Sequence, residues 1–566
     1  MFLQRLNEYA ARDDVPVPPT YYRRVPVRYL IELDAQGRPL TPVPVDTADS
    51  DDRAARRGQR LLMPQVQRAS GVRPLLLCDN AAYTLGLPRE GANAEREAQC
   101  HAAYLELLER CAQETDEPAV QAVLRFLTSA PLEQLKLPEA FDRSANLSFR
   151  VDGALPADLP AVRDLWADLN APAGDAVMSC LVCGRERPAL RRFTGKIKGI
   201  PGGQSSGTAL VSANENAFES YGLEASLIAP ICGPCGERLT VALNHLLRDD
   251  AHHLNVGKGA FVFWTREATT WSFADLMRQP EAEEVRHLLA SAYRRPGAAV
   301  EGNRFYAALL SASGGRAVVR EWIDTTLVQA QRHLARWFAG QRIVSAWGEE
   351  PRPLGLRALA AATERELGDV PPPTLQALLQ GALLGRPLPP GILYRAVQRT
   401  RADQGVSYQQ AALIKLVLAS RRLATGIADH EEDTMTQLDL SNATPAYLCG
   451  RLLATLERAQ RLAVPGAKAT LVDRYYGTAS TAPASVFGSL MNGAQAHLSK
   501  LRRDKPGAHH RIQEELEQIL AGLPAFPRTL SLDDQALFAL GYYHQRAHGR
   551  AQARAAGERE EEDDQE

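Results

Sequence analysis

The chain has 566 residues, of which 45% are hydrophobic and 23% are charged, and its formal net charge is −2 at pH 7. These values are typical of a soluble globular protein with several domains, and they exclude nucleic-acid binding through a globally basic charge. No apolar run approaches the ~20 residues that a membrane-spanning helix needs, so we expect no contact with a membrane. Eight cysteines in so long a chain fit the reducing cytoplasm, where we expect the protein to reside.

The first third of the chain predicts strands followed by helices. Residues 2–14 form a short amphipathic pattern, and residues 25–33 alternate like a strand that ends in the turn 34–37. Residues 48–60 have no apolar face and predict a mobile loop. Residues 92–129 carry apolar side chains at helical spacing, which places Cys100 and Cys111 in the core with Tyr104 and Leu108.

Two C-x-x-C pairs follow, Cys180 with Cys183 and Cys232 with Cys235. Each pair can direct two thiolates at one ion, and two pairs complete the tetrahedral sulfur shell that zinc prefers. We therefore predict one structural Zn²⁺ at these four cysteines, with flanking glycines that suit the turns. Two alternatives remain open from the sequence: four reduced thiols of which two occupy small core positions, or a redox pair.

The segment between the two cysteine pairs is basic and rich in glycine. Its first half, residues 184–207, carries six cations against one acid, Glu186. Lys196 and Lys198 flank Ile197 and would lie on one face of a strand. The glycines that follow expose backbone, and neighbouring polar side chains are of the kind that contacts phosphates or base edges. The predicted DNA-contacting residues are Lys196, Lys198, Gly202, Gly203, Gln204, Ser205 and Ser206. The alternative is a solvated surface hairpin, since charge runs commonly face water.

The strand signal ends in the middle of the chain. Residues 259–264 and 305–310 predict buried strands, and residues 317–339 predict a long helix. From about residue 353 onward, amphipathic helices alternate with proline-rich turns.

The fold class is therefore α+β, with a mixed N-terminal body and a mainly helical C-terminal half. The predicted division is a body at 1–350 that contains the zinc-knuckle region 180–236, a helical connection with an acidic linker at 351–434, a C-terminal helical bundle at 435–548, and a disordered acidic tail at 549–566.

Motifs of common catalytic sites are missing from the sequence. It contains neither G-x-x-x-x-G-K-[ST] nor H-E-x-x-H nor G-x-S-x-G. Asp249, Asp250, His252 and His253 resemble a hydrolytic metal cluster only superficially, because they crowd one helix end. We therefore expect a binding protein and not an enzyme.

Five blocks carry a more specific signal. They are P-Q-V-Q-R-A-S-G-V-R-P-L-L-L-C-D-N-A-A-Y-T-L-G at 64–86, K-I-K-G-I-P-G-G-Q-S-S-G-T-A-L-V-S-A-N-E-N-A-F-E-S-Y-G at 196–222, N-A-T-P-A-Y-L-C-G-R-L-L-A-T-L-E-R-A-Q at 442–460, D-R-Y-Y-G-T-A-S-T-A-P at 473–483 and L-D-D-Q-A-L-F-A-L-G-Y-Y-H-Q at 532–545. Together, and in this order, they resemble the large subunit of the type I-C CRISPR surveillance complex Cascade, the Csd-type family. The resemblance does not require the two C-x-x-C pairs, so the zinc prediction rests on their spacing.

The resemblance implies a non-catalytic subunit of an RNA-guided complex in antiviral defence. Such a subunit reads the protospacer-adjacent motif (PAM) on double-stranded DNA, helps to open the duplex, stabilises the displaced single strand and recruits a separate helicase-nuclease. Its partners would be the guide RNA and the backbone, small and repeat-RNA processing subunits. Arg68 and Asn80, in the first block, are weaker candidates for DNA contact, and Asn80 could equally cap the turn before Ala81. The alternative function is a zinc-ribbon scaffold that binds an acidic protein partner without reading DNA.

The resemblance also implies that the C-terminal bundle is made separately as the small subunit. Met435 is the best-placed internal start, because the next methionine, Met491, would discard the block at 442–460.

Overall fold

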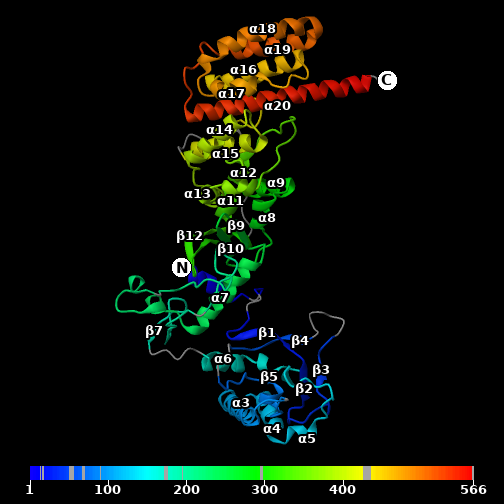
Figure 1. Cartoon of the computed structure of the whole chain (residues 1–566), viewed down its shortest axis with the longest axis vertical. Helices are drawn as coiled ribbons and strands as arrows, with labels where there is room; N and C mark the ends of the chain where they lie inside the picture. Colours follow the sequence, from blue (N-terminus) through cyan, green and yellow to red (C-terminus); the bar gives the residue numbers. More distant parts are fainter. Residues whose placement is uncertain are drawn as a thin grey trace. The chain divides into compact units, whose positions relative to one another are not determined.

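The structure is a computed structural model that describes all residues except 13, 16–17, 50–56, 67–70, 90, 171–175, 194, 214, 293–297, 425–434 and 564–566. Internal contacts divide the chain into two compact units. Unit 1 comprises Met1–Arg248 with Ala312–Val318, and unit 2 comprises Asp249–Ser311 with Val319–Glu566. The elements of each unit can be followed in Figure 1.

Unit 1 mixes short strands with helices. Its strands are β1 (Tyr22–Val27), β2 (Tyr29–Leu33), β3 (Val45–Asp46), β4 (Gln59–Pro64), β5 (Cys78–Asn80), β6 (Asn146–Val151), β7 (Val177–Ser179) and β8 (Glu186–Pro188). Its α-helices are α1 (Phe2–Ala10), α2 (Ala81–Thr84), α3 (Ala94–Thr115), α4 (Pro118–Thr128), α5 (Pro131–Gln134), α6 (Pro160–Leu169) and α7 (Gly233–Arg248). Short 3₁₀ turns lie at Pro156–Asp158, Asn216–Phe218 and Ala225–Ile228.

Unit 2 has one sheet and then only helices. Its strands are β9 (His253–Val256), β10 (Gly259–Thr265), β11 (Arg304–Ser313) and β12 (Arg316–Thr326). The tip of the β11–β12 hairpin, Ala312–Val318, belongs to unit 1. Its α-helices are α8 (Phe273–Arg278), α9 (Ala282–Ser291), α10 (Ala298–Glu301), α11 (Leu327–Gln341), α12 (Leu356–Ala361), α13 (Pro372–Leu384), α14 (Pro390–Ala402), α15 (Tyr408–Ala424), α16 (Pro445–Ala463), α17 (Leu471–Ala479), α18 (Phe487–Asp504), α19 (Pro506–Ala521) and α20 (Leu532–Asp563). Within the described ranges no strand follows Thr326, so the predicted α+β class with a helical C-terminal half is confirmed.

The main sheet of unit 1 has the order β3-β2-β6-β5, in which β2 and β6 are parallel and the outer pairs are antiparallel. The prediction of one strand at 25–33 was wrong. The chain breaks at Arg28, so that β1 pairs with β4 in a separate ribbon while β2 enters the main sheet. Both segments alternate, and the sequence pattern alone does not show that they pair with different partners.

Helix α3 buries one face in the core of unit 1, which it shares with strands of the main sheet. Cys100, Tyr104, Leu108 and Cys111 are buried on that face, as the helical spacing predicted. Cys78 on β5 is fully buried as well. These three cysteines are core residues.

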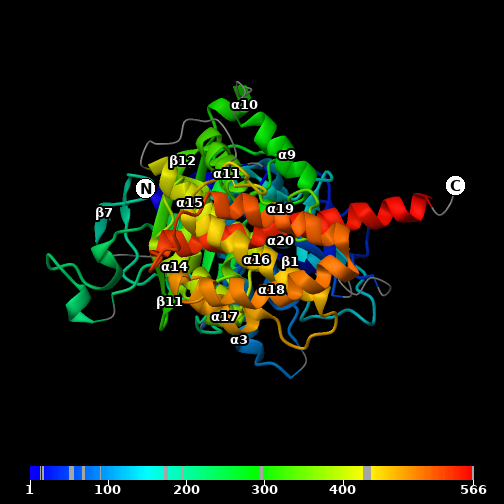
Figure 2. The same cartoon turned by 90° about the horizontal axis from the view of Figure 1, so that it is seen from above.

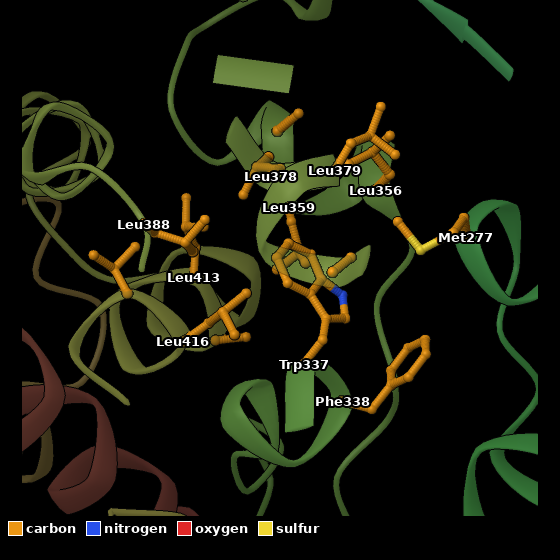
Figure 3. Close-up of a cluster of buried hydrophobic side chains, with 14 of the residues drawn as sticks. Met277, Trp337, Phe338, Leu356, Leu359, Leu378, Leu379, Leu388, Leu413 and Leu416 are labelled. Atoms are coloured by element: carbon orange, nitrogen blue, oxygen red, sulfur yellow. The ribbon is translucent and has the colours of Figure 1, made fainter. Parts of the chain in front are cut away.

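The core of unit 2 joins the sheet β9–β12 to helices α8–α15. Trp337 and Phe338 of α11 lie among leucines from α12, α13 and α15 and beside Met277 of α8 (Figure 3). This core also contains Phe261 and Phe305 of the sheet, and it continues without a break across residue 350. The loss of strands near that residue therefore marks where the sheet ends and not where the core ends.

The helix predicted at 317–339 was wrong over its first half. Residues Arg316–Thr326 form β12, and only Leu327–Gln341 is helical. Two features favour the strand: β-branched residues such as Val318, Val319 and Ile323, and pairing with the adjacent strand β11. The helix begins where the hydroxyl of Thr326 accepts a hydrogen bond from the backbone N–H of Gln329.

Helices α16–α20 form the C-terminal bundle, in which α16 and α20 cross with their backbones in contact. A Cβ atom on Gly450 would lie 2.0 Å from the carbonyl oxygen of Phe538, and one on Gly541 would lie 2.2 Å from that of Tyr447. Only glycine permits this approach, which explains the glycines in the blocks 442–460 and 532–545. Met435 precedes the bundle and is buried with Tyr447, and its role as an internal start stays a prediction.

Helix α20 extends beyond the other bundle helices in both views (Figures 1 and 2). It is continuous from Leu532 to Asp563, so residues 549–563, which were expected to be disordered, are helical in the structure. Alanine, arginine and glutamate dominate this stretch and are strong helix formers. The acidic linker at 431–433 lies outside the described residues. Among the described residues, no helix is long and apolar enough to cross a membrane.

A buried histidine lies on α20 inside unit 2. The ring of His544 is fully buried, and its Nδ1 lies 3.0 Å from the hydroxyl of Tyr447. The pKa of His544 falls from 6.5 to about 3, first because of burial and then because of the charge of Lys415, while a hydrogen bond with the backbone of Met435 and the charge of Asp439 oppose the shift. The folded protein therefore keeps this ring neutral at pH values where the unfolded chain protonates it.

We expect His544 to make unit 2 less stable in acid. Above pH 6.5 the ring is neutral in both states and contributes no pH dependence. As the pH falls from 6.5 toward 3, only the unfolded chain binds the proton, so the free energy of unfolding should fall by about 1 kcal/mol per pH unit through this residue. Denaturant unfolding at pH 7, 6 and 5 should show a shallower slope for His544→Asn than for the wild type. The same change at the exposed His510 is the control, and an unchanged slope in His544→Asn would contradict the prediction.

Candidate metal centre and basic loop

The first C-x-x-C pair lies in the turn of a small hairpin. Strands β7 and β8 pair antiparallel, and the turn between them carries Cys180 and Cys183. The amide of Cys180 donates to the carbonyl of Arg185 at 3.0 Å, and that of Gly184 donates to the carbonyl of Cys180 at 2.8 Å. Gly184 has φ +70°, a value that favours glycine, so it serves the turn as predicted.

The second pair lies at the N-terminus of α7. Cys232 precedes the helix and Cys235 lies in its first turn. The amide of Cys232 donates to the sulfur of Cys180 at 3.4 Å, which joins the two pairs directly. Gly236 is helical, and a Cβ there would lie 2.8 Å from Leu190. Its role is therefore close packing of α7 against the segment after β8, and not a turn.

The four sulfur atoms form one cluster. All of them lie within 4.8 Å of one another, and the sulfurs of Cys183 and Cys232 are 4.0 Å apart. Four thiolates around one tetrahedral ion with bonds of about 2.3 Å would be about 3.8 Å apart, so the spacing fits an ion at the centre. Three of the cysteines are buried and Cys183 is exposed. The group could therefore hold a metal ion.

The pKa values of the thiols in the cluster also favour binding of a cation at its centre. Hydrogen bonding from Cys235 lowers the pKa of Cys232 to about 5. The pKa of Cys235 is raised, first by its hydrogen bond to Cys232 and then by burial, and burial also raises the pKa of Cys183. The thiol of Cys232 therefore ionises readily, whereas hydrogen bonding, burial and, in smaller part, repulsion by neighbouring thiolates keep Cys235 protonated. A cation at the centre would remove that repulsion and stabilise all four thiolates.

The basic segment after the hairpin turns two lysines outward. Ile197 is 1% exposed, whereas Lys196 and Lys198 on either side of it are exposed, as the alternation predicted. Within the described residues neither lysine forms an ion pair, and Arg191 is paired with Glu224. The lysines therefore present two uncompensated charges at the start of the basic loop, which we define as residues 196–208.

Helix α7 also binds the backbone of the basic loop. Asn244 accepts a hydrogen bond from the amide of Lys198 at 2.8 Å and donates one to the carbonyl of Lys196 at 2.9 Å. The side-chain amide of Asn244 thus bonds to the backbone on both sides of Ile197, as a neighbouring strand would. The helix that carries the second cysteine pair at its start therefore positions the two lysines near its end.

The far end of the basic loop closes on its own start. Ile197 and Thr208 exchange two backbone hydrogen bonds of 2.8 Å. Gly207 has φ +96°, and a Cβ there would lie 2.9 Å from the Cβ of Lys196, so this position requires glycine. Ala209 is the first residue after the loop. Its amide donates to the carbonyl of Gly315, and its carbonyl accepts from the amide of Ala317. Both partners lie in the hairpin tip 312–318, which belongs to the same unit. Both ends of the loop are thereby fixed.

The tip of the basic loop exposes polar groups. Gln204, Ser205 and Ser206 are exposed, as is Gly202, while Gly203 is half-buried. A Cβ on Gly315 of the hairpin tip would lie 3.4 Å from the amide oxygen of Gln204. The structure therefore brings all seven residues predicted for this loop together on one rigid segment.

The sequence matches the model of one known protein family. The model of the CRISPR-associated protein family Cas_Csd1 matches residues 3–549. The chain belongs to the Csd1 family. No curated protein matches it in sequence. Membership makes this Csd1 protein the large subunit of a CRISPR Cascade complex, in which it assembles with other Cas subunits and the guide RNA.

The weaker candidates of this Csd1 protein have structural roles or lie outside the described residues. The side chain of Asn80 caps α2, because it accepts hydrogen bonds from the amides of Ala82 and Tyr83. Its neighbour Asp79 is 1% exposed and accepts a hydrogen bond from the amide of Leu75, so it cannot reach DNA. Arg68 lies outside the described residues.

The histidines and acids at 249–253 form no metal cluster among the described residues. The Nε2 of His252 lies 3.9 Å from Asp249, and that of His253 lies 4.0 Å from Asp250, so the two pairs are separate.

Sequence reasoning did not identify Asn244 or the hairpin tip as parts of the site. Asn244 is separated from Lys198 by 46 positions, and only the path of α7 brings it close. The one available signal was an asparagine that follows the apolar residues Val241, Ala242 and Leu243 within a helix, a weak indication because such a residue commonly faces water.

We expect Asn244→Ala to loosen the basic loop without unfolding unit 1. The change removes two hydrogen bonds to the backbone at 196–198, each of which contributes about 1 kcal/mol. Hydrogen exchange followed by mass spectrometry should show faster exchange at residues 196–208 and unchanged exchange in α3. Asn216→Ala, at an exposed position of the same unit, is the control. Equal exchange in Asn244→Ala and the wild type would show that Asn244 does not position the loop.

Proposed function

We propose that this Csd1 protein reads the protospacer-adjacent motif of double-stranded DNA through its basic loop. The observation that carries the proposal is the pair of exposed lysines, Lys196 and Lys198, on a backbone bound by Asn244 and closed by Thr208. Two uncompensated ammonium groups at a fixed spacing suit neighbouring phosphates, since contacts to phosphates set the position of a protein on the duplex.

The tip of the same loop offers groups for sequence reading. Gln204 can donate to and accept from one base edge in the major groove, and glycines beside it let the backbone approach the groove. In an RNA-guided complex the guide reads the target by pairing, so the protein needs to read only the short flanking motif. A small rigid loop is sufficient for that task.

The further steps follow from the family resemblance. After the flanking motif is bound, the subunit would help to open the duplex, stabilise the displaced strand and recruit a separate helicase-nuclease. No catalytic step is assigned to this chain in the proposal. Two observations support a binding role for this chain and a catalytic role for a separate protein: the geometry of the loop and membership of the Csd1 family.

We also propose that the ion of the cysteine cluster is Zn²⁺ and that its role is structural. Four sulfur donors at tetrahedral spacing match the preference of zinc and leave no open coordination position for a substrate. The ion would join the β7–β8 hairpin to the start of α7 and would thereby fix the helix that carries Asn244.

Zinc content and stability should depend on the cluster. We expect about one equivalent of zinc per purified chain by elemental analysis. Cys183→Ser should lower both the zinc content and the unfolding temperature, because metal binding is coupled to folding of the region. Cys100→Ala, in the core outside the cluster, should keep its zinc. Zinc well below half an equivalent in carefully purified wild-type protein would contradict the proposal.

Measurements of DNA binding should distinguish the role of the two lysines from the role of Gln204. In the assembled complex, Lys196→Ala and Lys198→Ala should weaken binding to every duplex and should each flatten the dependence of log K on log salt by about one unit. Gln204→Ala should instead reduce the preference for one flanking trinucleotide, by about 1–3 kcal/mol for a bidentate contact.

The exposed Lys136 of the same unit provides the matched control, since Lys136→Ala removes one charge outside the loop. Filter binding over a range of salt concentrations, with duplexes that differ only in the flanking trinucleotide, measures both effects. Equal losses for Lys136→Ala and Lys196→Ala would overturn the role of the loop. A loss for Gln204→Ala that is the same on every duplex would make it a positioning residue.

A further inference from the structure

The C-terminal bundle contains a cavity that the proposed function does not use. It lies between α16, α19 and α20 and has a volume of about 290 Å³. Its charged lining consists of five arginines and two glutamates, which leaves a surplus of three positive charges. Such a surplus in a partly buried cavity is unfavourable unless an anion compensates it.

The two glutamates already have partners within the bundle. Glu457 forms an ion pair with Arg461 and accepts a hydrogen bond from the hydroxyl of Tyr542 at 2.8 Å. Glu515 forms an ion pair with Arg458 at 2.7 Å and accepts a hydrogen bond from Gln545 at 3.0 Å. Glu457 also forms an ion pair with Arg546 at 3.5 Å. The two acids therefore serve three of the five arginines, and the lining keeps its surplus of positive charge.

Several donors of the five guanidinium groups are available for a ligand. Arg511 is exposed on α19 and makes no ion pair with the described residues. The Nε of Arg458 is buried without a hydrogen-bond partner among them. Arg550 donates to the carbonyl of Ala346 at 3.3 Å and lies over the ring of Trp347. Burial lowers the pKa of Arg550, and the nearby charges of Arg546 and Arg461 lower it further, while Glu457 and Tyr542 oppose the shift.

The rest of the lining is partly apolar. Alanine and aliphatic side chains alternate with the arginines, among them Leu462, Ala508 and Ile512. A guanidinium group binds a phosphate through two parallel hydrogen bonds, and apolar walls beside it can accept an organic group. The cavity is also near the lower end of the size range of small-molecule sites.

We propose that this cavity binds a phosphorylated small molecule of nucleotide size. The phosphate groups would contact Arg511 and those donors of Arg461 that its ion pair with Glu457 through Nη2 does not use, and the organic part would lie against the apolar walls. This site is independent of the proposed DNA contact, because it belongs to unit 2 and the basic loop belongs to unit 1. A single nucleic-acid strand offers similar phosphates, so the experiment includes one as a separate ligand.

The test uses the full chain and isothermal titration calorimetry with ADP, inorganic pyrophosphate and a thymidine 20-mer. We expect the wild type to bind ADP and pyrophosphate. The double variant Arg461→Ala with Arg511→Ala should bind them about tenfold or more weakly, since it loses the charge-assisted hydrogen bonds of two guanidinium groups to phosphate. Arg511→Lys should recover part of the affinity, because it keeps the charge but not the two parallel donors. Arg357→Ala, at an exposed position of α12, should bind like the wild type.

Three results would overturn the proposal. The first is no binding of either small phosphate by wild-type protein at millimolar concentration. The second is binding that Arg461→Ala with Arg511→Ala leaves unchanged. The third is binding of the 20-mer, but of neither small phosphate, that depends on these arginines, which would make the cavity a strand contact. An unfolding temperature equal to that of the wild type shows that each variant is folded, and Arg511→Ala alone serves if the double variant is not.

Discussion

Helix α7 is the constraint on which the candidate site depends. Its first turn provides one cysteine pair, and the amide of Cys232 is hydrogen-bonded to the sulfur of Cys180 in the other pair. Asn244, about two and a half turns along the same helix, binds the backbone on both sides of Ile197. The direction of one rigid helix thus connects the cysteine cluster to the positions of Lys196 and Lys198. An ion among the cysteines would fix that helix and, through it, the loop.

The C-terminal bundle depends on a different contact, which is the direct approach of two helix backbones. Gly450 and Gly541 let α16 and α20 cross closely, and polar side chains beside the crossing are thereby buried. Glu457 is 2% exposed and is paired with Arg461 and Tyr542, so its charge is compensated. Buried charges of this kind require complete hydrogen bonding, and they make the register of the two helices specific. The arginine-lined cavity lies between the same two helices and α19.

Positive charge has two distinct environments in this protein, and each suits another kind of ligand. The lysines of the basic loop are exposed and carry compact charges on a rigid backbone, which suits the phosphates of an extended duplex. The arginines of the bundle cavity are partly buried, and their planar groups suit close contact with single phosphates. The net charge of −2 for the whole chain does not indicate either group of positive charges. A ligand responds to the charges within about 10 Å of its site, because salt screens those farther away.

The sequence by itself determined the features that depend on local spacing. The two C-x-x-C pairs predicted the sulfur cluster, the alternation at 196–198 predicted two outward lysines, and the helical spacing of Cys100 and Cys111 predicted a buried face. Tertiary structure alone decided the rest. The break at Arg28, the strand at 316–326 and the helical face that brings Asn244 to the loop depend on partners far away in the chain. Local periodicity states how a segment can fold, but the choice among its partners is made by packing and long-range hydrogen bonds, which no short window of sequence contains.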